Sequence, residues 1–404
     1  MPVKTLSSFV WGFTLAVLSF SGILPAAEQS ESADGQKPTK GYYKTEPLAG
    51  ASQGGATGAL VPKVQPPGGT TVAAIPMSTY SFVSTKDGKT YTGTMVGTSP
   101  FAVTKASATI PLVIVPVKIT IGSSVFDPTA PNICDGNISA VNRFNQSPLV
   151  QVAPMTFKGV SMGTTQYLNA YRRAEFWNTI GGSAAYQNTL TPVTSAATVS
   201  VTAGTNGTVY SSGCTQLGIV SYAWLNSYIT GTLLPKLTTA GVVSPSKFVV
   251  FLFRDIVEST SAPPTTAACC VLGFHGANGN PVQTWAAVDW DSTNIFAGIS
   301  DATIASHELG EWMDDPLGTN ATPAWGGIGQ VAACQSNFEN GDPLTGKQMP
   351  AITLTGKLYH MQELAYFSWF FNKLGVASVG AGGGFSSNGT FAGTSKVCPA
   401  GGTN

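Results

Sequence analysis

The chain has 404 residues with 43% hydrophobic and only 10% charged side chains, and its 20 basic residues balance its 20 acidic ones. A neutral chain without a basic stripe does not have the composition of a nucleic-acid-binding protein. The apolar content is enough for a sizeable core.

The first 27 residues have the pattern of a secretory signal peptide. Lys4 supplies a positive charge, residues 9–20 supply an apolar run, and residues 25–27 offer small side chains for cleavage. This run is short for a membrane span, and no other stretch reaches about 18 apolar residues. We therefore expect a secreted protein, extracellular or periplasmic, without membrane attachment after signal cleavage.

Composition divides the rest of the chain into three parts. Residues 28–75 are rich in Gly, Pro, Ser and Thr without a sustained period, which predicts a disordered linker. Residues 76–375 are expected to form a single large domain. Residues 376–404 are a Gly/Ser-rich tail.

The first half of the domain predicts strands and one notable helix. Residues 80–83 and 91–96 flank an Asp87-Gly88 turn, which is typical of a β-hairpin. Residues 110–121 are β-branched but contain prolines, so we expect an edge or bulged strand. Residues 165–180 predict a helix, with Arg172 and Arg173 as a surface pair.

The second half, residues 246–375, is interpreted as the part that builds the site. An apolar run at 247–257 predicts a buried strand, and shorter strands are expected at 271–275 and 284–289. A helix is predicted next, within residues 301–316, and a very aromatic helical stretch at 358–374.

The predicted helix contains the sequence His307-Glu308-Leu309-Gly310-Glu311. Residues four apart share a helical face, so His307 and Glu311 point the same way. Leu309, Trp312 and Met313 fall on the opposite face, which we expect to lie in the core.

The charge around this helix favours a cation site over an ordinary solvated face. Residues 255–346 contain eleven Asp and Glu but no Lys or Arg. A solvated helix commonly mixes charges of both signs, which then pair along its surface. A region of one sign is more typical of cation binding.

The motif resembles the zincin metallopeptidase helix, in which two His bind zinc and the Glu between them is the general base. Here Glu311 stands at the second ligand position, and carboxylates also bind Zn²⁺. The resemblance implies an α/β (α+β) fold, with a mixed sheet packed on the active-site helix and additional hairpins in the N-terminal half. It assigns His307 and Glu311 to the metal and Glu308 to catalysis.

A second, weaker resemblance is to secreted proteins of the phosphate-induced, Exordium-like type. It is carried by the strand FVVFLFRDIVE, by Cys270 with Gly-Phe-His-Gly at 273–276, and by Thr-Trp-Ala-Ala-Val at 284–288. This resemblance implies secretion and a shared scaffold, and it places His275 near the site.

A metal shell on this helix needs a further ligand from elsewhere in the chain. A downstream carboxylate completes the site in many zincins, so Asp342 and Glu339 are the candidates. Tyr359 is a candidate for stabilising an oxyanion, against the alternative of a core aromatic residue. For His275 and His360, an ordinary structural role competes with metal contact.

Six cysteines in an exported chain predict disulfides, with 15 possible full pairings. We expect a bond between Cys334 and Cys398, which would tie the tail to the loop after the helix. Cys269 and Cys270 are adjacent, and we expect them not to pair with each other.

The sequence therefore predicts an exported zinc-dependent hydrolase, in which Zn²⁺ activates water and Glu308 accepts its proton. The expected substrate is a peptide or protein. The main alternative is a secreted or cell-surface binding protein with a structural or vestigial metal site, and a metallohydrolase with a non-peptide substrate is a third interpretation.

Overall fold

The computed structural model describes residues 38, 40–49, 74–193, 197–212, 214–372, 384–396 and 398. The predicted signal peptide, most of the predicted linker and part of the tail lie outside these residues. Within the described ranges, no helix is both long and apolar enough to cross a membrane.

A large mixed sheet contains eleven of the strands in the described part of the chain. Eight strands follow one another in the order β10 (Gly207–Ser212), β11 (Thr215–Ser221), β13 (Ile256–Ser259), β14 (Cys269–Asn278), β15 (Gln283–Trp290), β12 (Phe248–Arg254), β4 (Ser107–Ile121) and β5 (Ser124–Phe126). Three more pair alongside: β1 (Tyr42–Glu46) with β14, and both β8 (Gln187–Val193) and β9 (Val199–Thr202) with β4.

The centre of this sheet is buried on both faces. In β12, Phe248, Val250 and Leu252 pack into one apolar cluster. The alternating residues Val249, Phe251 and Phe253 pack into a second cluster on the other face. Successive side chains of a strand point to opposite faces, so a continuous apolar run is what a doubly covered strand requires.

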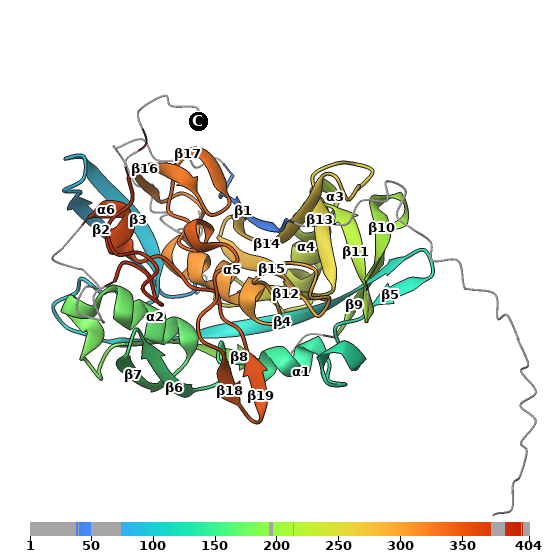
Figure 1. Ribbon diagram of the computed structural model, residues 1–404, viewed down its shortest axis with the longest axis horizontal. Coiled ribbons are helices and arrows are strands. Elements are labelled where there is room, and N and C mark those ends of the chain that lie inside the picture. The colour runs from blue at the N-terminus through green and yellow to red at the C-terminus, as the bar shows by residue number, and fades with distance from the viewer. Residues whose placement is uncertain are drawn as a thin grey trace, which may run out of the picture. The chain divides into compact units, whose positions relative to one another are not determined.

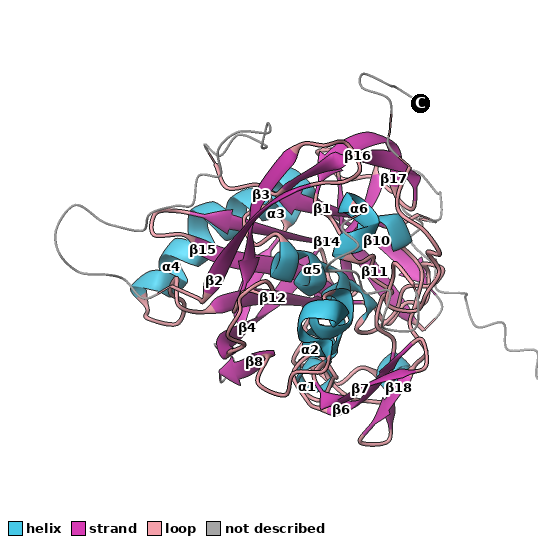
Figure 2. Ribbon diagram, turned by 90° about the vertical axis from the view of Figure 1, so that its left-hand side faces the viewer, coloured by secondary structure: helices cyan, strands magenta, loops and turns pink. Residues whose placement is uncertain are grey.

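Helices cover the two faces of the sheet. They are α1 (Ala140–Asn145), α2 (Tyr167–Glu175), α3 (Tyr222–Tyr228), α4 (Leu234–Thr239), α5 (Thr303–Asp314) and the short α6 (Phe367–Phe371). Figure 2 shows α3 and α4 on one side of the strands and α1, α2 and α5 on the other. The helix with the His-Glu motif, α5, lies near the middle, close to β14 and β15 (Figure 1).

Smaller β-hairpins surround the main sheet. They are β2 (Met77–Val83) with β3 (Thr90–Val96), β6 (Ala153–Phe157) with β7 (Val160–Thr165), β16 (Ala321–Ile328) with β17 (Val331–Asn337), and β18 (Ile352–Leu354) with β19 (Lys357–Tyr359). The β2–β3 pair confirms the hairpin predicted around Asp87-Gly88, and β6–β7 is a further hairpin in the N-terminal half. The predicted α+β class is thus confirmed as a mixed sheet with few helices.

Residues 110–121 are predicted to form an edge or a bulged strand, and the edge alternative is wrong. Strand β4 pairs with β12 over residues 112–116. It also pairs with β8 over residues 107–113 and with β9 over residues 117–120. The register with β8 ends at Val113 and that with β9 begins at Val117. Pro116 therefore lies where one partner replaces the other, which is how an interior strand accommodates a residue without an N–H group.

Two other predicted segments differ from the structure. Residues 358–374 are expected to be one helix, but within the described residues 358–372 only Phe367–Phe371 is α-helical, and Asn372 ends it with a left-handed φ of 53°. Residues 42–46, inside the predicted linker, form strand β1, which pairs in parallel with β14. Both errors arise because long-range packing decides the state of a short segment.

The six cysteines form three disulfides. Cys334 pairs with Cys398, which confirms the predicted bond, and Cys134 pairs with Cys214. The adjacent Cys269 and Cys270 also pair with each other, so that prediction is wrong. A disulfide-bonded chain fits an oxidising compartment.

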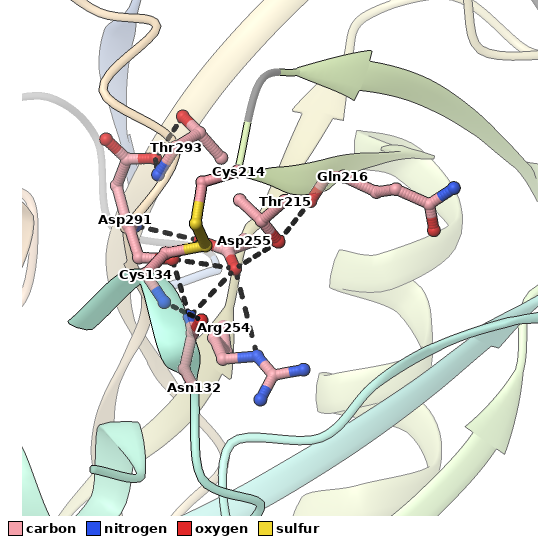
Figure 3. Close-up of a disulfide and its surroundings, with 10 residues drawn as sticks. Asn132, Cys134, Cys214, Thr215, Gln216, Arg254, Asp255, Asp291 and Thr293 are labelled. Atoms are coloured by element: carbon pink, nitrogen blue, oxygen red, sulfur yellow. Dashed lines mark hydrogen bonds and ion pairs between the residues drawn. A yellow bond between two sulfur atoms is a disulfide. The ribbon is translucent and has the colours of Figure 1, made fainter. Parts of the chain in front are cut away.

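The Cys134–Cys214 disulfide lies beside a buried acid, Asp255, in the turn between β12 and β13 (Figure 3). Ser292 donates to Asp255 from both its backbone nitrogen and its hydroxyl, each over 2.8 Å. Asn132 and Thr215 donate to the same carboxylate over 3.4 and 3.3 Å. This carboxylate is therefore surrounded by donors that hold the turn closed.

Candidate metal centre

Helix α5 is buried along its whole length. As predicted, Leu309, Trp312 and Met313 pack in the apolar core, and Trp312 stacks on Phe248 of β12 with ring centroids 3.6 Å apart. The polar face, which carries the His-Glu motif, is covered too. A buried polar face requires internal partners for its charges.

A glycine of β14 allows the polar face of α5 to approach the sheet. A Cβ atom built on Gly273 would lie 2.9 Å from Glu308 Oε1 and 2.9 Å from a methyl carbon of Ile304. Any larger residue would push the helix away, so this position brings β14 and the His-Glu motif together.

A first group of metal-type donors forms around His307. Its Nε2 lies 3.1 Å from Glu311 Oε1 and 3.6 Å from Asp342 Oδ1. One donor atom from each of these three residues lies within 4.8 Å of the other two. Asp342 begins a short 3-10 turn, Asp342–Leu344, after β17.

Two further residues fix the position of His307. The ring of Tyr43, from β1, stacks on the imidazole with centroids 3.5 Å apart. On the Gly341 side, an added Cβ would lie 2.4 Å from His307 Nδ1. The backbone nitrogen of Gly341 also donates to Glu311 Oε1 over 3.1 Å. The imidazole is therefore held between β1 and the loop that carries Asp342.

A second group of donors forms around His275 of β14. Its Nδ1 lies 3.1 Å from Glu308 Oε2 and 3.7 Å from Glu311 Oε2. Donor atoms of these three residues also lie within 4.8 Å of one another. His275 thus lies beside the His-Glu motif, where it contacts Glu308 and Glu311.

The carboxylates of the cluster repel one another in a buried setting. Burial, followed by the charges of Glu311, Glu339 and Asp342, raises the pKa of Glu308 well above its ordinary value. Burial and then Glu311 raise the pKa of Asp342 in the same way.

The pKa values of Glu311 and His275 are lowered instead. Burial also acts to raise the pKa of Glu311, but the opposing effects of His307, His275 and the Gly341 N–H bring it below its ordinary value. Burial lowers the pKa of His275 to about 4, against the attraction of Glu311. His275 is therefore a neutral imidazole at pH 7, the form that binds metals.

The acids at the end of α5 have other partners. Asp314 Oδ1 pairs with Arg172 over 2.6 Å, and Asn340 donates to Oδ2 over 2.6 Å. Arg172 is completely buried in α2, so the prediction of a surface arginine is wrong. Because Asn340 precedes Gly341, this ion pair also supports the loop beside His307.

The other predicted site residues lie around or away from these groups. Glu339 is buried beside them but belongs to neither group. The Arg143 guanidinium lies over the Tyr359 ring, 4.4 Å from the ring centre. The tyrosine that stacks on His307 is Tyr43. His360 Nδ1 lies 2.7 Å from Asp301 Oδ2.

A polar pocket of about 370 Å³ reaches the first group. Its wall includes Asp342 and Glu339, three residues of β1 and most of β17. Comparisons with protein families, curated proteins and solved structures find no match. The chemistry of the residues must therefore carry the functional argument.

Proposed function

We propose that this chain is an exported, zinc-dependent hydrolase that cleaves peptide bonds. The observation that carries the proposal is the first group, in which His307, Glu311 and Asp342 bring an imidazole and two carboxylates within 4.8 Å of one another. These are the ligand types of zinc hydrolases.

The spacing of the group suits zinc. Zn–N and Zn–O bonds of about 2.0–2.2 Å in tetrahedral geometry separate two ligand atoms by about 3.3–3.5 Å. The contacts from His307 Nε2, at 3.1 and 3.6 Å, lie close to that separation. Three protein ligands leave a fourth position for water, as in catalytic zinc sites.

Glu308 is suited to act as the general base. Its Oε2 faces His275, while Oε1 is buried without a hydrogen-bond partner among the described residues. A bound zinc supplies Lewis acidity, which makes a water easier to deprotonate. Glu308 would accept that proton and pass it to the leaving amine.

The pocket favours an extended peptide as the substrate. Strands β1 and β17 line it from two sides. Among the described strands, β17 pairs only with β16. In β1, the Gln330 side chain already binds the backbone N–H and carbonyl of Tyr43. A strand without a partner on one side can bind an extended peptide through main-chain hydrogen bonds. The polar lining also suits peptide groups better than an apolar ligand.

Zinc analysis of the purified protein tests the metal assignment. The wild type should retain zinc after gel filtration, and His307→Ala should lose it from the first group. His360→Ala is the matched control, because this histidine is paired with Asp301 outside both groups. Equal zinc content in all three proteins would sink the assignment.

Glu308→Gln tests the catalytic role. It preserves the size of the side chain but cannot accept a proton, so turnover of a peptide substrate library should fall by about 10²–10⁴. Zinc in the first group should remain bound. If the zinc-loaded variant matches the wild type in rate, Glu308 is not the base.

One contact favours a second candidate, a secreted binding protein with a structural metal. Glu308 already contacts His275 over 3.1 Å, as a carboxylate held away from catalysis would. In that case zinc would raise stability, but the zinc-loaded wild type would hydrolyse no member of a broad peptide and ester panel. Measuring zinc content and hydrolysis on one sample separates the two functions.

A further inference from the structure

The two donor groups meet at one residue. Glu311 belongs to both, and it faces them with different oxygens. Its Oε1 lies 3.1 Å from His307 Nε2, and its Oε2 lies 3.7 Å from His275 Nδ1. A single carboxylate therefore stands between two imidazoles.

The two groups also match in size and composition. Each combines one histidine with two carboxylates, all of them buried. The first has contacts of 3.1 and 3.6 Å from its histidine, and the second has contacts of 3.1 and 3.7 Å. Whatever spacing allows a cation in the first group allows one in the second.

The number of carboxylates in the cluster suits a second cation. The buried cluster holds Glu308, Glu311 and Asp342, with Glu339 beside them. The ion pairs that the structure shows for the first three are all with His275 or His307. When all four carboxylates are ionised, one divalent cation offsets only half of their charge, whereas two offset it all. Unpaired buried charge is strongly unfavourable, so full ionisation of the cluster goes together with a second cation.

We propose that the centre binds two divalent cations, with Glu311 bridging them. The first is held by His307, Glu311 and Asp342, and the second by His275, Glu308 and Glu311. Two-metal hydrolase sites place their ions about 3.5–4 Å apart, a separation that one bridging carboxylate spans. The inference rests on the proposed function for the first cation and adds a second.

A cation in the second group would still allow Glu308 to act as the general base. The oxygen that faces His275 is Oε2, so that atom is the ligand. The other oxygen, Oε1, has no hydrogen-bond partner among the described residues and stays available to a water. The second cation would thus orient Glu308 and would replace the His275 contact seen without metal.

Metal titration tests the second site. Protein stripped with a chelator should take up about two equivalents of Zn²⁺, as measured by competition with a chromophoric chelator. His275→Ala should take up about one equivalent, because only the second group is lost. Glu308→Gln, which keeps the shape of the side chain, should also lose the second equivalent. Circular dichroism of each metal-free variant checks that it is folded.

Manganese provides a spectroscopic readout. With Mn²⁺ in place of zinc, electron paramagnetic resonance should show an exchange-coupled pair in the wild type and an isolated ion in His275→Ala. Uptake of a single equivalent by both wild type and His275→Ala would overturn the second site. That result would leave the hydrolase proposal standing, since hydrolysis by the single-zinc protein is measured separately.

Discussion

Helix α5 and the residue that follows it carry four buried acids, which fall into two differently built pairs. Near its end, Asp314 pairs with Arg172 over 2.6 Å. The next residue, Asp315, accepts backbone N–H groups from Thr319 and Asn320, each over 2.9 Å. One to two turns earlier, Glu308 and Glu311 face mainly His275 and His307.

The contrast shows that burial alone does not identify a metal site. Buried carboxylates become structural when permanent cations or N–H donors surround them, as at Asp314, Asp315 and Asp255. Glu308 and Glu311 instead share their space with imidazoles, which are neutral ligands as well as donors. The surrounding residues therefore distinguish a site built for the fold from one suited to a cation.

The largest expected effect on stability comes from removing the permanent cation. Arg172→Met should lower the free energy of unfolding by about 3–5 kcal/mol, because Asp314 would stay buried without its partner. Urea unfolding measures this change. Arg173→Met is the control, since Arg173 donates to the carbonyl oxygens of Met162 and Gly181 and pairs with no carboxylate in the described contacts. Equal losses in both variants would contradict the proposed importance of the ion pair.

Zinc removal should have the next largest effect on stability, and this effect should depend on the site around Glu308 and Glu311. A ligand present at 100 times its dissociation constant stabilises the folded state by about 2.7 kcal/mol. Adding zinc to stripped protein should raise the thermal midpoint of the wild type. It should raise that of His307→Ala much less. The same zinc response in both proteins would argue against His307 as a ligand.

A smaller loss is expected at the donor-rich end. Asp315→Asn replaces one of two acceptor oxygens with an N–H donor that opposes a backbone N–H. The mismatch should lower the unfolding free energy by about 1–3 kcal/mol. Zinc content should stay at the wild-type level. A loss of zinc in this variant would mean that the two pairs of acids are not separate in function.

The smallest effect concerns pH and His360, whose partner Asp301 lies just before α5. Its hydrogen bond with Asp301 raises its pKa above the ordinary 6.5, against partial burial. A raised folded-state pKa means that the stabilisation is complete below about 6.5 and is lost as pH rises through the folded value. His360→Gln should flatten this part of the stability–pH curve. An identical slope in the variant would show that His360 contributes nothing to it.

The local features of the site could be predicted from sequence. His307 and Glu311 are four residues apart, so helical geometry alone brings them together. Trp312 packs in the core because the same periodicity places it on the apolar face. Strand β12 was predictable from its uninterrupted apolar run.

The contributions from distant segments were not predictable in this way. Tyr43 stacks on a histidine 264 positions later, and nothing in the sequence around it indicates that partner. Arg172 was assigned to the surface because its acid, Asp314, lies on another helix. His275 was placed near the site only through a family resemblance, which no comparison has tested.

Strand β1 has a consequence for the order in which the protein assembles. It pairs with β14, more than 220 residues further along the chain, and its Tyr43 covers His307. During synthesis these early residues must wait until both partners have emerged, and Asp342 emerges later still. The centre can therefore close only when most of the chain is made. A protein shortened to begin at residue 76 would lack Tyr43 and the β1 wall of the pocket.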